Sequence, residues 1–289
     1  MGDRIGVIGV GNMGAAMAAR LLERGFDVAV RDIRNEAEQP LLAAGARRAA
    51  SPLAAAQSCT TILIVVVDAH QIDTVLGGND GLLPGLNPNH LVLLQSTIAP
   101  ADAARLAASV AERGAHVLDA PISGGPARAR AGQLSMMVAG SDAAFDRAHA
   151  VLDALAARVF RVGAAPGLGA TMKLVNNLLA GVYLAAGAEA FAIGRAAGLA
   201  PETMAQVFAA SSGQSWILDD RLARLIAGDE RPRAQMHILA KDLRLAVDLA
   251  RSVGKDTALG TATSALFAAA VAAGLTDADD SELIAFAAR

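Results

Sequence analysis

The sequence predicts an α/β protein in which a doubly wound parallel sheet is followed by an all-α domain built around a long central helix. Strand-like and helix-like segments alternate through the first half of the chain, a glycine cluster follows the first strand, and strand signals stop after Gly163. A length of 289 residues also suits about two domains. Repeated βα units imply parallel strands side by side with helices on both faces of the sheet.

Short apolar runs and glycine-terminated helices define the elements of the first half. The run Ile62–Val67 is apolar and β-branched throughout, which is typical of a fully buried strand. Helices are expected to end at Gly25, Gly45 and Gly114, because glycine suits the left-handed position after a helix. The predicted strands are Ile5–Gly9, Asp27–Arg31, Ile62–Val67, Leu91–Leu94, His116–Asp119, Met136–Ala139 and Val159–Val162, and the predicted helices are Ala15–Arg24, Leu41–Ala44 and Ala101–Arg113.

The second half reads as helical throughout. Ala170–Ala197 is one long helical pattern, and further helical segments follow it. Gly163, Pro166 and Gly167 suit a junction between domains. We therefore expect one domain over residues 1–162 and an all-helical domain over residues 163–289.

Composition excludes several classes of protein. With 25 Lys and Arg against 28 Asp and Glu, the net charge of −3 argues against binding to nucleic acid or to anionic membranes through bulk charge. A hydrophobic share of 54% indicates a protein rich in buried core. The single cysteine, Cys59, excludes an intrachain disulfide framework and is expected to fill apolar space, and no metal site is assigned. Since no span reaches the roughly 18 apolar residues of a membrane helix, we expect a cytoplasmic protein.

A glycine loop follows the first predicted strand and opens the first helix. Gly9, Val10, Gly11, Asn12, Met13 and Gly14 form the pattern G-x-G-x-x-G. The glycines allow a tight turn, a close approach of the backbone to a pyrophosphate, and close packing of helix on strand. Alone the pattern also fits a plain turn. In this context it predicts a Rossmann-type domain that binds a dinucleotide at the helix N-terminus.

Asp32 strengthens that prediction. It lies 18 residues after Gly14, at the end of the second predicted strand, where its carboxylate can accept hydrogen bonds from an adenosine ribose and repel a 2′-phosphate. A turn-capping role is the alternative. The expected cofactor is NAD, with NADP possible because Arg31 and Arg34 flank the carboxylate and could hold a phosphate.

The segment Asp119–Pro126 follows a predicted strand at the carboxyl edge of the sheet, where open α/β sheets bind ligands. The backbone N–H groups around Ser123, Gly124 and Gly125 can line a concavity that holds a carboxylate, and the Ser123 hydroxyl can contact a substrate oxygen. A glycine and proline turn without a ligand is the alternative.

The long helix carries Lys173 and, four residues on, Asn177, so both side chains point the same way. Their neighbours are apolar nearly all round the helix, which suggests burial. The pKa of a lysine falls when the group is desolvated or lies near another cation, and an oxidised nicotinamide is such a cation. Lys173 could then accept a hydroxyl proton while hydride leaves the same carbon. The alternative is a solvated surface charge.

Together these motifs make the chain resemble the β-hydroxyacid dehydrogenase family over essentially its full length. The resemblance implies that Lys173 is catalytic and that Asn177 orients the substrate beside Ser123, Gly124 and Gly125. Ser96–Pro100 is similar to the family's cofactor-contacting segment, which implies that Thr97 lies near the nicotinamide half. Lys241–Leu243 is similar to a late lysine motif, which implies that Lys241 closes over the cofactor and the substrate. The remaining expected cofactor residue is Val67, at the end of the strand Ile62–Val67.

Within the family, three segments resemble the L-threonate dehydrogenase subfamily: Asn177–Val182, Ser211–Trp216 and Asp279–Ser281. This resemblance implies oxidation of a 2-hydroxyl by NAD. The segment Ser123–Arg128 departs from that pattern, so 3-hydroxyisobutyrate and tartronate semialdehyde remain open as substrates. Trp216 is expected either in the core or lining the site. A dinucleotide-binding module without catalysis and a 6-phosphogluconate enzyme are the less favoured interpretations. An apolar helical domain of this size suggests a homodimer or homotetramer.

Overall fold

The computed structural model describes residues 4–229 and 231–288. Contacts divide the chain into two compact units, Met1–Lys173 and Leu174–Arg289, which are described separately. Helix α8, Leu168–Ala196, begins in the first unit and continues into the second, which we call the helical unit. The domain boundary expected between residues 162 and 163 lies at the end of the last strand, β9 Ala156–Gly163, and the two units divide ten residues later, after Lys173.

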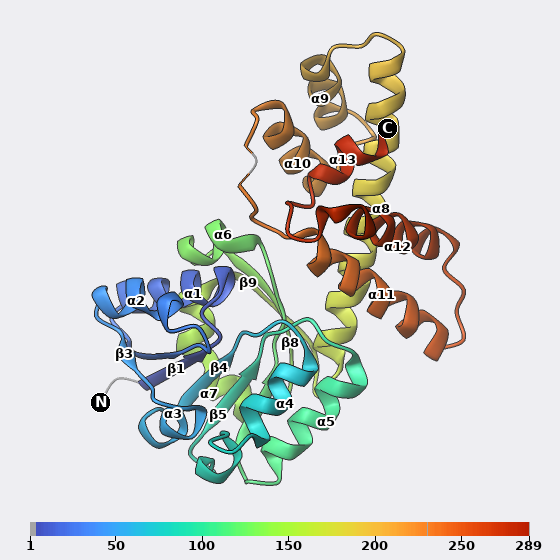
Figure 1. Ribbon diagram of the computed structural model, residues 1–289. Helices are drawn as coiled ribbons and strands as arrows, with labels where there is room; N and C mark the ends of the chain where they lie inside the picture. The colour runs from blue at the N-terminus through green and yellow to red at the C-terminus, as the bar shows by residue number, and fades with distance from the viewer. Residues whose placement is uncertain (1–3, 230, 289) are drawn as a thin grey trace. The chain divides into compact units, whose positions relative to one another are not determined.

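The first unit is built on one sheet with strand order β3-β2-β1-β4-β5-β6-β8-β7 and with β9 beside β8 (Figure 1). From β3 to β6 all strands are parallel, as predicted. The sheet departs from the predicted parallel arrangement at β8, which runs antiparallel to β6 and β7. The strands are β1 Arg4–Ile8, β2 Asp27–Arg31, β3 Arg47–Arg48, β4 Thr61–Ile64, β5 Leu91–Leu94, β6 His116–Asp119, β7 Ile122–Ser123, β8 Leu134–Ala139 and β9 Ala156–Gly163.

The antiparallel step has a simple geometric cause. Residues 124–133, which connect β7 to β8, are fewer than the dozen or more that a parallel crossover requires. This segment includes a short helix, α6, and returns the chain beside β6 in the opposite direction. The loop that was predicted to bind substrate is therefore fixed at both ends by the sheet.

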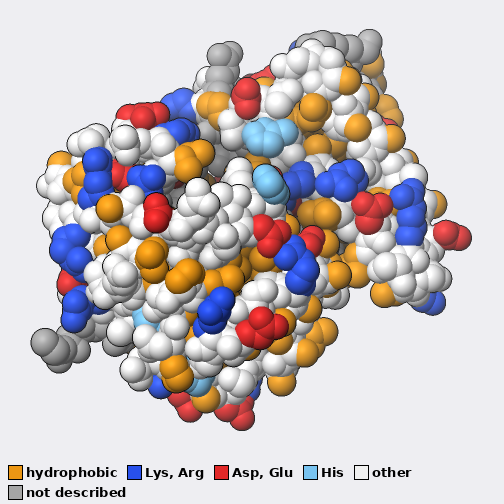
Figure 2. Space-filling view, turned by 60° about the horizontal axis from the view of Figure 1, so that its bottom comes forward, with side chains coloured by type: hydrophobic (Ala, Val, Ile, Leu, Met, Phe, Trp, Pro, Cys, Tyr) orange, Lys and Arg blue, Asp and Glu red, His pale blue; other side chains and the backbone are white. Residues whose placement is uncertain are grey.

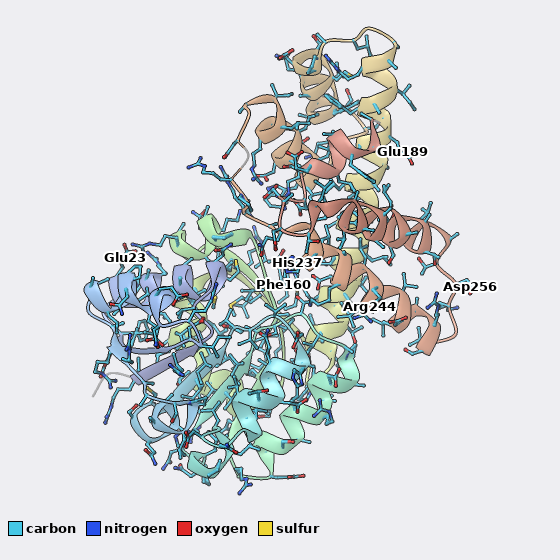
Figure 3. All side chains as sticks on the ribbon, viewed as in Figure 1. Glu23, Phe160, Glu189, His237, Arg244 and Asp256 are labelled. Carbon is cyan, nitrogen blue, oxygen red and sulfur yellow. The ribbon has the colours of Figure 1, made fainter. Side chains whose placement is uncertain are left out.

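Helices cover both faces of this sheet. One apolar core joins the sheet to α1 and α7 through residues such as Met17, Leu21 and Val151, and the other joins it to α3, α4 and α5. Glu23 at the end of α1, labelled in Figure 3, forms an ion pair with Arg130 of α6. Cys59 is 2% exposed in the second core, as expected of an apolar filler. The helices are α1 Asn12–Glu23, α2 Asn35–Ala43, α3 Pro52–Ser58, α4 Ala69–Gly77, α5 Pro100–Ala111, α6 Gly125–Ala131 and α7 Asp142–Leu155, with a 3-10 turn, η1, at Leu83–Gly85.

The helical unit packs around α8, as the sequence predicts. Glycines allow close approach to this helix: a Cβ on Gly181 would lie 2.7 Å from Leu243 of α11, and one on Gly187 would crowd Leu218 of α10. The core is centred on fully buried side chains such as Phe267. The other elements are α9 Pro201–Ala210, α10 Trp216–Ile226, α11 Met236–Ser252, α12 Ala258–Ala270, the π-helical turn η2 Val271–Leu275 and α13 Glu282–Ala287.

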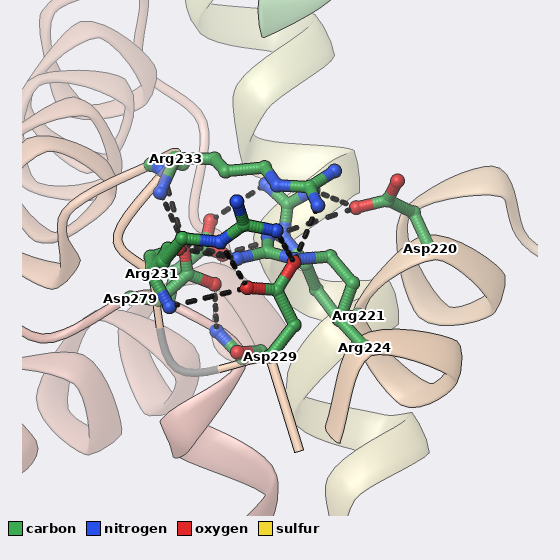
Figure 4. A network of polar contacts seen from close by, with 10 residues as sticks. Asp220, Arg221, Arg224, Asp229, Arg231, Arg233 and Asp279 are labelled. Carbon is green, nitrogen blue, oxygen red and sulfur yellow. Dashed lines mark hydrogen bonds and ion pairs between the residues drawn. The ribbon is translucent and has the colours of Figure 1, made fainter. Parts of the chain in front are cut away.

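A network of arginines and aspartates holds the C-terminal loop against α10 (Figure 4). Arg224 Nη2 lies 2.9 Å from Asp279 Oδ2, and Arg221 pairs with Asp280 at 3.0 Å between Nη2 and Oδ2. Both aspartates are 2% exposed. Because breaking one partner of a buried ion pair leaves an uncompensated charge, this network ties the segment around residue 280 firmly to the unit.

Two helical stretches are long and apolar enough to cross a membrane when judged by length and composition alone, Leu168–Ala196 and Ala258–Leu275. The expectation that no segment reaches that limit is therefore too strict. Core helices of non-membrane proteins pass the same test, so the finding by itself is weak evidence for a membrane span. The face shown in Figure 2 carries basic and acidic side chains interspersed, in line with the near-balanced composition.

Candidate active site

The glycine loop turns tightly from β1 into α1. Gly9 has a φ of +89°, and a Cβ there would lie 2.9 Å from the carbonyl carbon of Val65. A Cβ on Gly14 would collide with the carbonyl of Gly9. Helix α1 begins at Asn12 with Gly11 as N-cap and without a side-chain capping bond, so its first N–H groups remain available to an anion. These features fit the pyrophosphate of a dinucleotide.

Asp32 is bound to the glycine loop itself. Its Oδ2 accepts a hydrogen bond from the Val10 N–H at 2.8 Å, and its Oδ1 accepts one from the Arg34 N–H at 2.9 Å. The side chain is 7% exposed. Two carboxylate oxygens offer about four acceptor positions, so the contacts leave capacity for ribose hydroxyls. Asp32 thus has a structural role in holding the glycine loop, and this role is compatible with the predicted contact to a ribose.

Glu38 is a further buried acidic residue beside Asp32, and no motif in the sequence marks it. It is fully buried, its Oε1 accepts the Asp32 N–H at 2.8 Å, and its Oε2 lies 2.7 Å from Arg48 Nε. Arg34 lies near the loop, with Nη2 3.8 Å from the position of a Cβ on Gly11. The acidic Asp32 and a basic Arg34 therefore stand together at the expected adenosine end of the site.

The loops that follow β4 and β5 meet at the carboxyl edge of the sheet. Strand β4 ends at Ile64, so the predicted strand Ile62–Val67 is too long and Val67 is 41% exposed. The strand ends there because the next N–H groups donate to side chains and not to a neighbouring strand. The Val66 N–H donates to Ser96 Oγ in the loop after β5 at 3.2 Å, and the Val67 N–H donates to Gln71 Oε1 of α4 at 2.9 Å. Thr97 follows Ser96 and is half-buried.

The segment predicted to hold a carboxylate has a backbone that only glycine adopts readily. Ser123 ends β7 and pairs with Ser135 of β8. Gly124 and Gly125 have φ values of +135° and +73°, which L side chains rarely adopt. Helix α6 starts at Gly125, with Pro126 in its first turn. The predicted residues thus form a sharp turn at the sheet edge, with the N–H groups of a helix start beside the Ser123 hydroxyl.

Lys173 belongs to the same unit as these loops. It lies on α8 one turn after Gly169 and is only 7% exposed, next to the fully buried Leu174. This burial disfavours the alternative of a solvated surface charge. The idea that α8 is buried nearly all round is wrong, because one stripe of the helix is 39–50% exposed. The stripe consists of Leu168, Met172, Val175, Leu179 and Tyr183.

In the helical unit, Asn177 and Lys241 converge on one acidic residue, Asp242. Asn177 Nδ2 donates to Asp242 Oδ2 at 2.6 Å, and Lys241 Nζ lies 2.9 Å from Asp242 Oδ1 in an ion pair. Asp242 is 2% exposed. The sequence motifs mark the amide and the lysine but not the carboxylate that joins them. Its position directly after Lys241 was the only available signal.

Other singled-out residues take different places. Trp216 begins α10 and is 51% exposed, so the interpretation as a core residue is wrong. Asp279, Asp280 and Ser281 belong to the buried ionic network and therefore have a structural role. Within residues 4–229 and 231–288, His, Cys, Asp and Glu side chains form no group of three that could hold a metal ion.

The fold and these loops define a class of protein: an oxidoreductase that uses a nicotinamide dinucleotide. The glycine turn without room for side chains, the uncapped start of α1 and the acidic residue after β2 fit the pyrophosphate and ribose of such a cofactor. A buried lysine, Lys173, lies in the same unit.

Comparison with known proteins specifies the family. Residues 4–163 match the model of the NAD binding domain of 6-phosphogluconate dehydrogenase, and residues 167–287 match that of the NAD-binding region of NADP-dependent 3-hydroxyisobutyrate dehydrogenase. L-threonate dehydrogenase from Cupriavidus necator is 40% identical over 98% of this chain and 96% of its own length. The chain belongs to the β-hydroxyacid dehydrogenase family of NAD(P)-dependent oxidoreductases, which act on the CH–OH group of small hydroxy acids.

Solved structures agree with this assignment. A 3-hydroxyisobutyrate dehydrogenase from Salmonella typhimurium has a TM-score of 0.91 and 37% identity, covering 98% of this chain and 99% of its own. Psf3, solved in complex with NADP+ and 2-OPP, has the same TM-score and 29% identity, again covering 98% and 99%. The family resemblance and the fold class predicted from the sequence are therefore confirmed, and so is NAD(P) as cofactor.

Proposed function

We propose that this enzyme oxidises the 2-hydroxyl of L-threonate, with Lys173 as the group that accepts the hydroxyl proton. The observation that carries the proposal is the burial of Lys173 in the unit that also holds the glycine loop and the Ser123–Gly125 turn. Bound nicotinamide supplies the hydride acceptor. Every other step belongs to side chains and backbone groups of this chain.

The substrate carboxylate binds at the turn formed by Ser123, Gly124 and Gly125. Backbone N–H groups at the start of α6 and the Ser123 hydroxyl donate to its oxygens. This anchoring leaves the 2-hydroxyl as the reacting group. Lys173 takes the hydroxyl proton as the C–H bond breaks, and it returns the proton in the reverse reaction.

Asn177 and Lys241 are proposed as the substrate-orienting amide and the cofactor-contacting cation. Asp242 supports this assignment, because it fixes both groups by a hydrogen bond and an ion pair. A side chain held in one position in advance loses less entropy when a ligand binds. The proposed cofactor residues also include Gly9–Gly14, Asp32, Val67 and Thr97.

L-threonate is favoured over other hydroxy acids by the relative from Cupriavidus necator, whose identity to this chain is 40%. The second candidate is 3-hydroxyisobutyrate, which the name of the Salmonella typhimurium structure suggests. Pro126 in the first turn of α6 stands next to the proposed carboxylate-binding turn, where it would bear on the choice of acid. Tartronate semialdehyde stays a third possibility for the reverse reaction.

A homodimer or homotetramer in the cytoplasm is also proposed. The exposed apolar stripe of α8, from Leu168 to Tyr183, gives a second copy of the chain a surface to cover. Both membrane-length helices lie within residues 167–287, which match a dehydrogenase domain, and this supports a non-membrane protein. Light scattering at working concentration is the check, and a single monomeric species would contradict the proposed assembly.

A cofactor-reduction screen tests the substrate. L-threonate, 3-hydroxyisobutyrate, glycerate and L-serine are offered with NAD and with NADP in parallel, and the absorbance of the reduced cofactor is followed. We expect the highest kcat/KM with L-threonate and NAD. A higher value with another acid would replace the substrate assignment, and no turnover with any acid, despite cofactor binding, would favour a non-catalytic module.

A further inference from the structure

The end of strand β6 and the start of helix α8 are joined by one buried carboxylate. Asp119 is the last residue of β6 and is 1% exposed. Its Oδ2 accepts hydrogen bonds from the N–H of Gly167 at 2.8 Å and from the N–H of Ala170 at 2.9 Å. Gly167 directly precedes α8 and Ala170 lies in its first turn, where the N–H groups have no partner within the helix. Asp119 therefore caps α8 from far away in the sequence, since Gly167, directly before the helix, lies 48 residues after Asp119.

The backbone of α8 approaches β6 so closely at this point that a side chain does not fit. A Cβ on Gly169 would lie 2.6 Å from the carbonyl oxygen of Asp119 and 2.8 Å from that of Met137. Gly167, with a φ of +101°, gives the chain the turn that leads into the helix. The first turn of α8 is thus fixed against the sheet by both hydrogen bonds and contact.

Two parts of the proposed active site depend on this junction. Lys173 lies one helical turn after Gly169 and three residues after Ala170, within the same rigid segment. On the other side, the chain leaves Asp119 directly into Ala120–Ser123, the stem of the carboxylate-binding turn. The Ala120 N–H still donates to the Leu94 carbonyl at 2.8 Å, so this stem begins within the sheet.

We propose that Asp119 is a positioning residue: by capping α8 it sets the distance between Lys173 and the Ser123–Gly125 turn. This inference rests on the proposed function of Lys173. A misplacement of about 1 Å at a reacting group costs on the order of 10²-fold in rate, so a cap that holds this turn in place affects turnover as well as folding.

The charge of Asp119 is not needed for the cap. Burial raises the pKa of this carboxyl, and the N–H groups of Ala170, Gly167 and Gly169 act against that rise. An asparagine has the same shape and one carbonyl oxygen, which can accept the same two N–H groups without a buried charge. Asp119→Asn is therefore the variant that keeps the geometry, and Asp119→Ala is the variant that removes it.

The matched control removes a helix cap elsewhere in the same unit. Ser141 Oγ accepts the Ala144 N–H at 3.3 Å and caps α7, which carries none of the proposed site residues. Ser141→Ala should lower the melting temperature and leave kcat per folded molecule unchanged. A loss of kcat in this control as large as that in Asp119→Ala would overturn the inference, since any lost cap would then have the same effect.

The experiment compares wild type, Asp119→Asn, Asp119→Ala and Ser141→Ala. We expect Asp119→Ala to lose about 10²-fold in kcat per folded molecule, with an unchanged Kd for NAD, and Asp119→Asn to stay within about threefold of wild type. If Asp119→Ala does not fold, Asp119→Ser, which keeps a shorter acceptor, takes its place and should lose at least 10-fold. Wild-type kcat in Asp119→Ala or Asp119→Ser would overturn the positioning role.

Hydrogen exchange separates this inference from the proposed function. Amides at the start of α8 should exchange faster in Asp119→Ala than in wild type or Asp119→Asn, whether or not any hydroxy acid is oxidised. Faster exchange with no turnover in wild type would reject the proposed function and keep the cap. Unchanged exchange in Asp119→Ala would reject the cap itself.

Discussion

Asn177 of α8 and Asp242 of α11 are joined by a side-chain hydrogen bond of 2.6 Å between residues 65 positions apart. The bond ties the proposed substrate amide to the residue that follows the proposed cofactor lysine. Since hydrogen bonds to charged groups contribute about 1.5–3 kcal/mol, we expect Asn177→Ala and Asp242→Ala to be strongly non-additive. Urea unfolding of the two single variants and the double variant should give a coupling energy of about 1–3 kcal/mol. Additive effects would mean that the bond does not exist in solution.

Asp32 should set the preference for NAD over NADP. The Asp32 carboxylate would repel the 2′-phosphate of NADP. The Arg34 side chain, whose Nε lies 3.4 Å from Asp32 Oδ1, is a cation that could hold that phosphate. Asp32→Asn should therefore raise the ratio of kcat/KM with NADP to that with NAD by at least about 10-fold. Asp32→Asn combined with Arg34→Ala should lose most of the gain. If the ratio is unchanged in Asp32→Asn, Asp32 does not determine the preference for NAD over NADP.

Gly169 should tolerate no side chain. A Cβ there meets two backbone carbonyl oxygens closer than 3.0 Å, and neither can move without shifting a strand. Gly169→Ala should cost about 2–5 kcal/mol in the free energy of unfolding. Gly77→Ala is the matched control, because a Cβ at the end of α4 meets nothing within 4 Å. Chemical denaturation of both variants is the measurement, and equal stabilities would contradict the close approach of α8 to the sheet.

The stability of the first unit should depend on pH through Asp119. Burial raises the pKa of this carboxyl above its ordinary value of 3.8. A group with a raised pKa stabilises the fold below the unfolded pKa, and that stabilisation is lost as the pH rises through the folded pKa. Asparagine does not titrate. The melting temperature of Asp119→Asn minus that of wild type should therefore increase as the pH rises from about 4 and then level off. A difference that decreases over this range would show the opposite shift.

The features that could be predicted from the sequence are local ones. Three elements follow from patterns that are local in the sequence: the glycine loop, the strand that ends at Arg31 and the helix that carries Lys173. Periodicity also indicates that Lys173 is buried, because apolar neighbours surround it. For these elements the local preference and the tertiary fold agree, and so the expected residues occupy the expected elements.

The features that could not be predicted depend on partners distant in sequence. Asp119 binds N–H groups 48 and 51 residues away, and Asp242 binds an amide 65 residues away. Nothing in the local pattern around either aspartate specifies such a partner. Strand β8 reverses direction for a different reason, because its connection from β7 is too short for a parallel crossover. The exposed stripe of α8 was missed because composition does not reveal which apolar face remains uncovered.

The segment Asp279–Ser281 shows how a sequence resemblance can mark structure. Its two aspartates are buried partners of Arg221 and Arg224. In this chain the segment therefore serves the packing of the helical unit, and its resemblance carries no information about which acid is bound.

The central claim is that Lys173 moves the proton that accompanies hydride transfer, and one variant tests it most directly. Single-turnover reduction of NAD by the enzyme's best substrate is compared in wild type and Lys173→Ala, with NAD binding measured by calorimetry. We expect the rate to fall by a factor on the order of 10² to 10⁴ while the Kd for NAD stays nearly unchanged. A hydride-transfer rate close to that of wild type in Lys173→Ala would contradict the account.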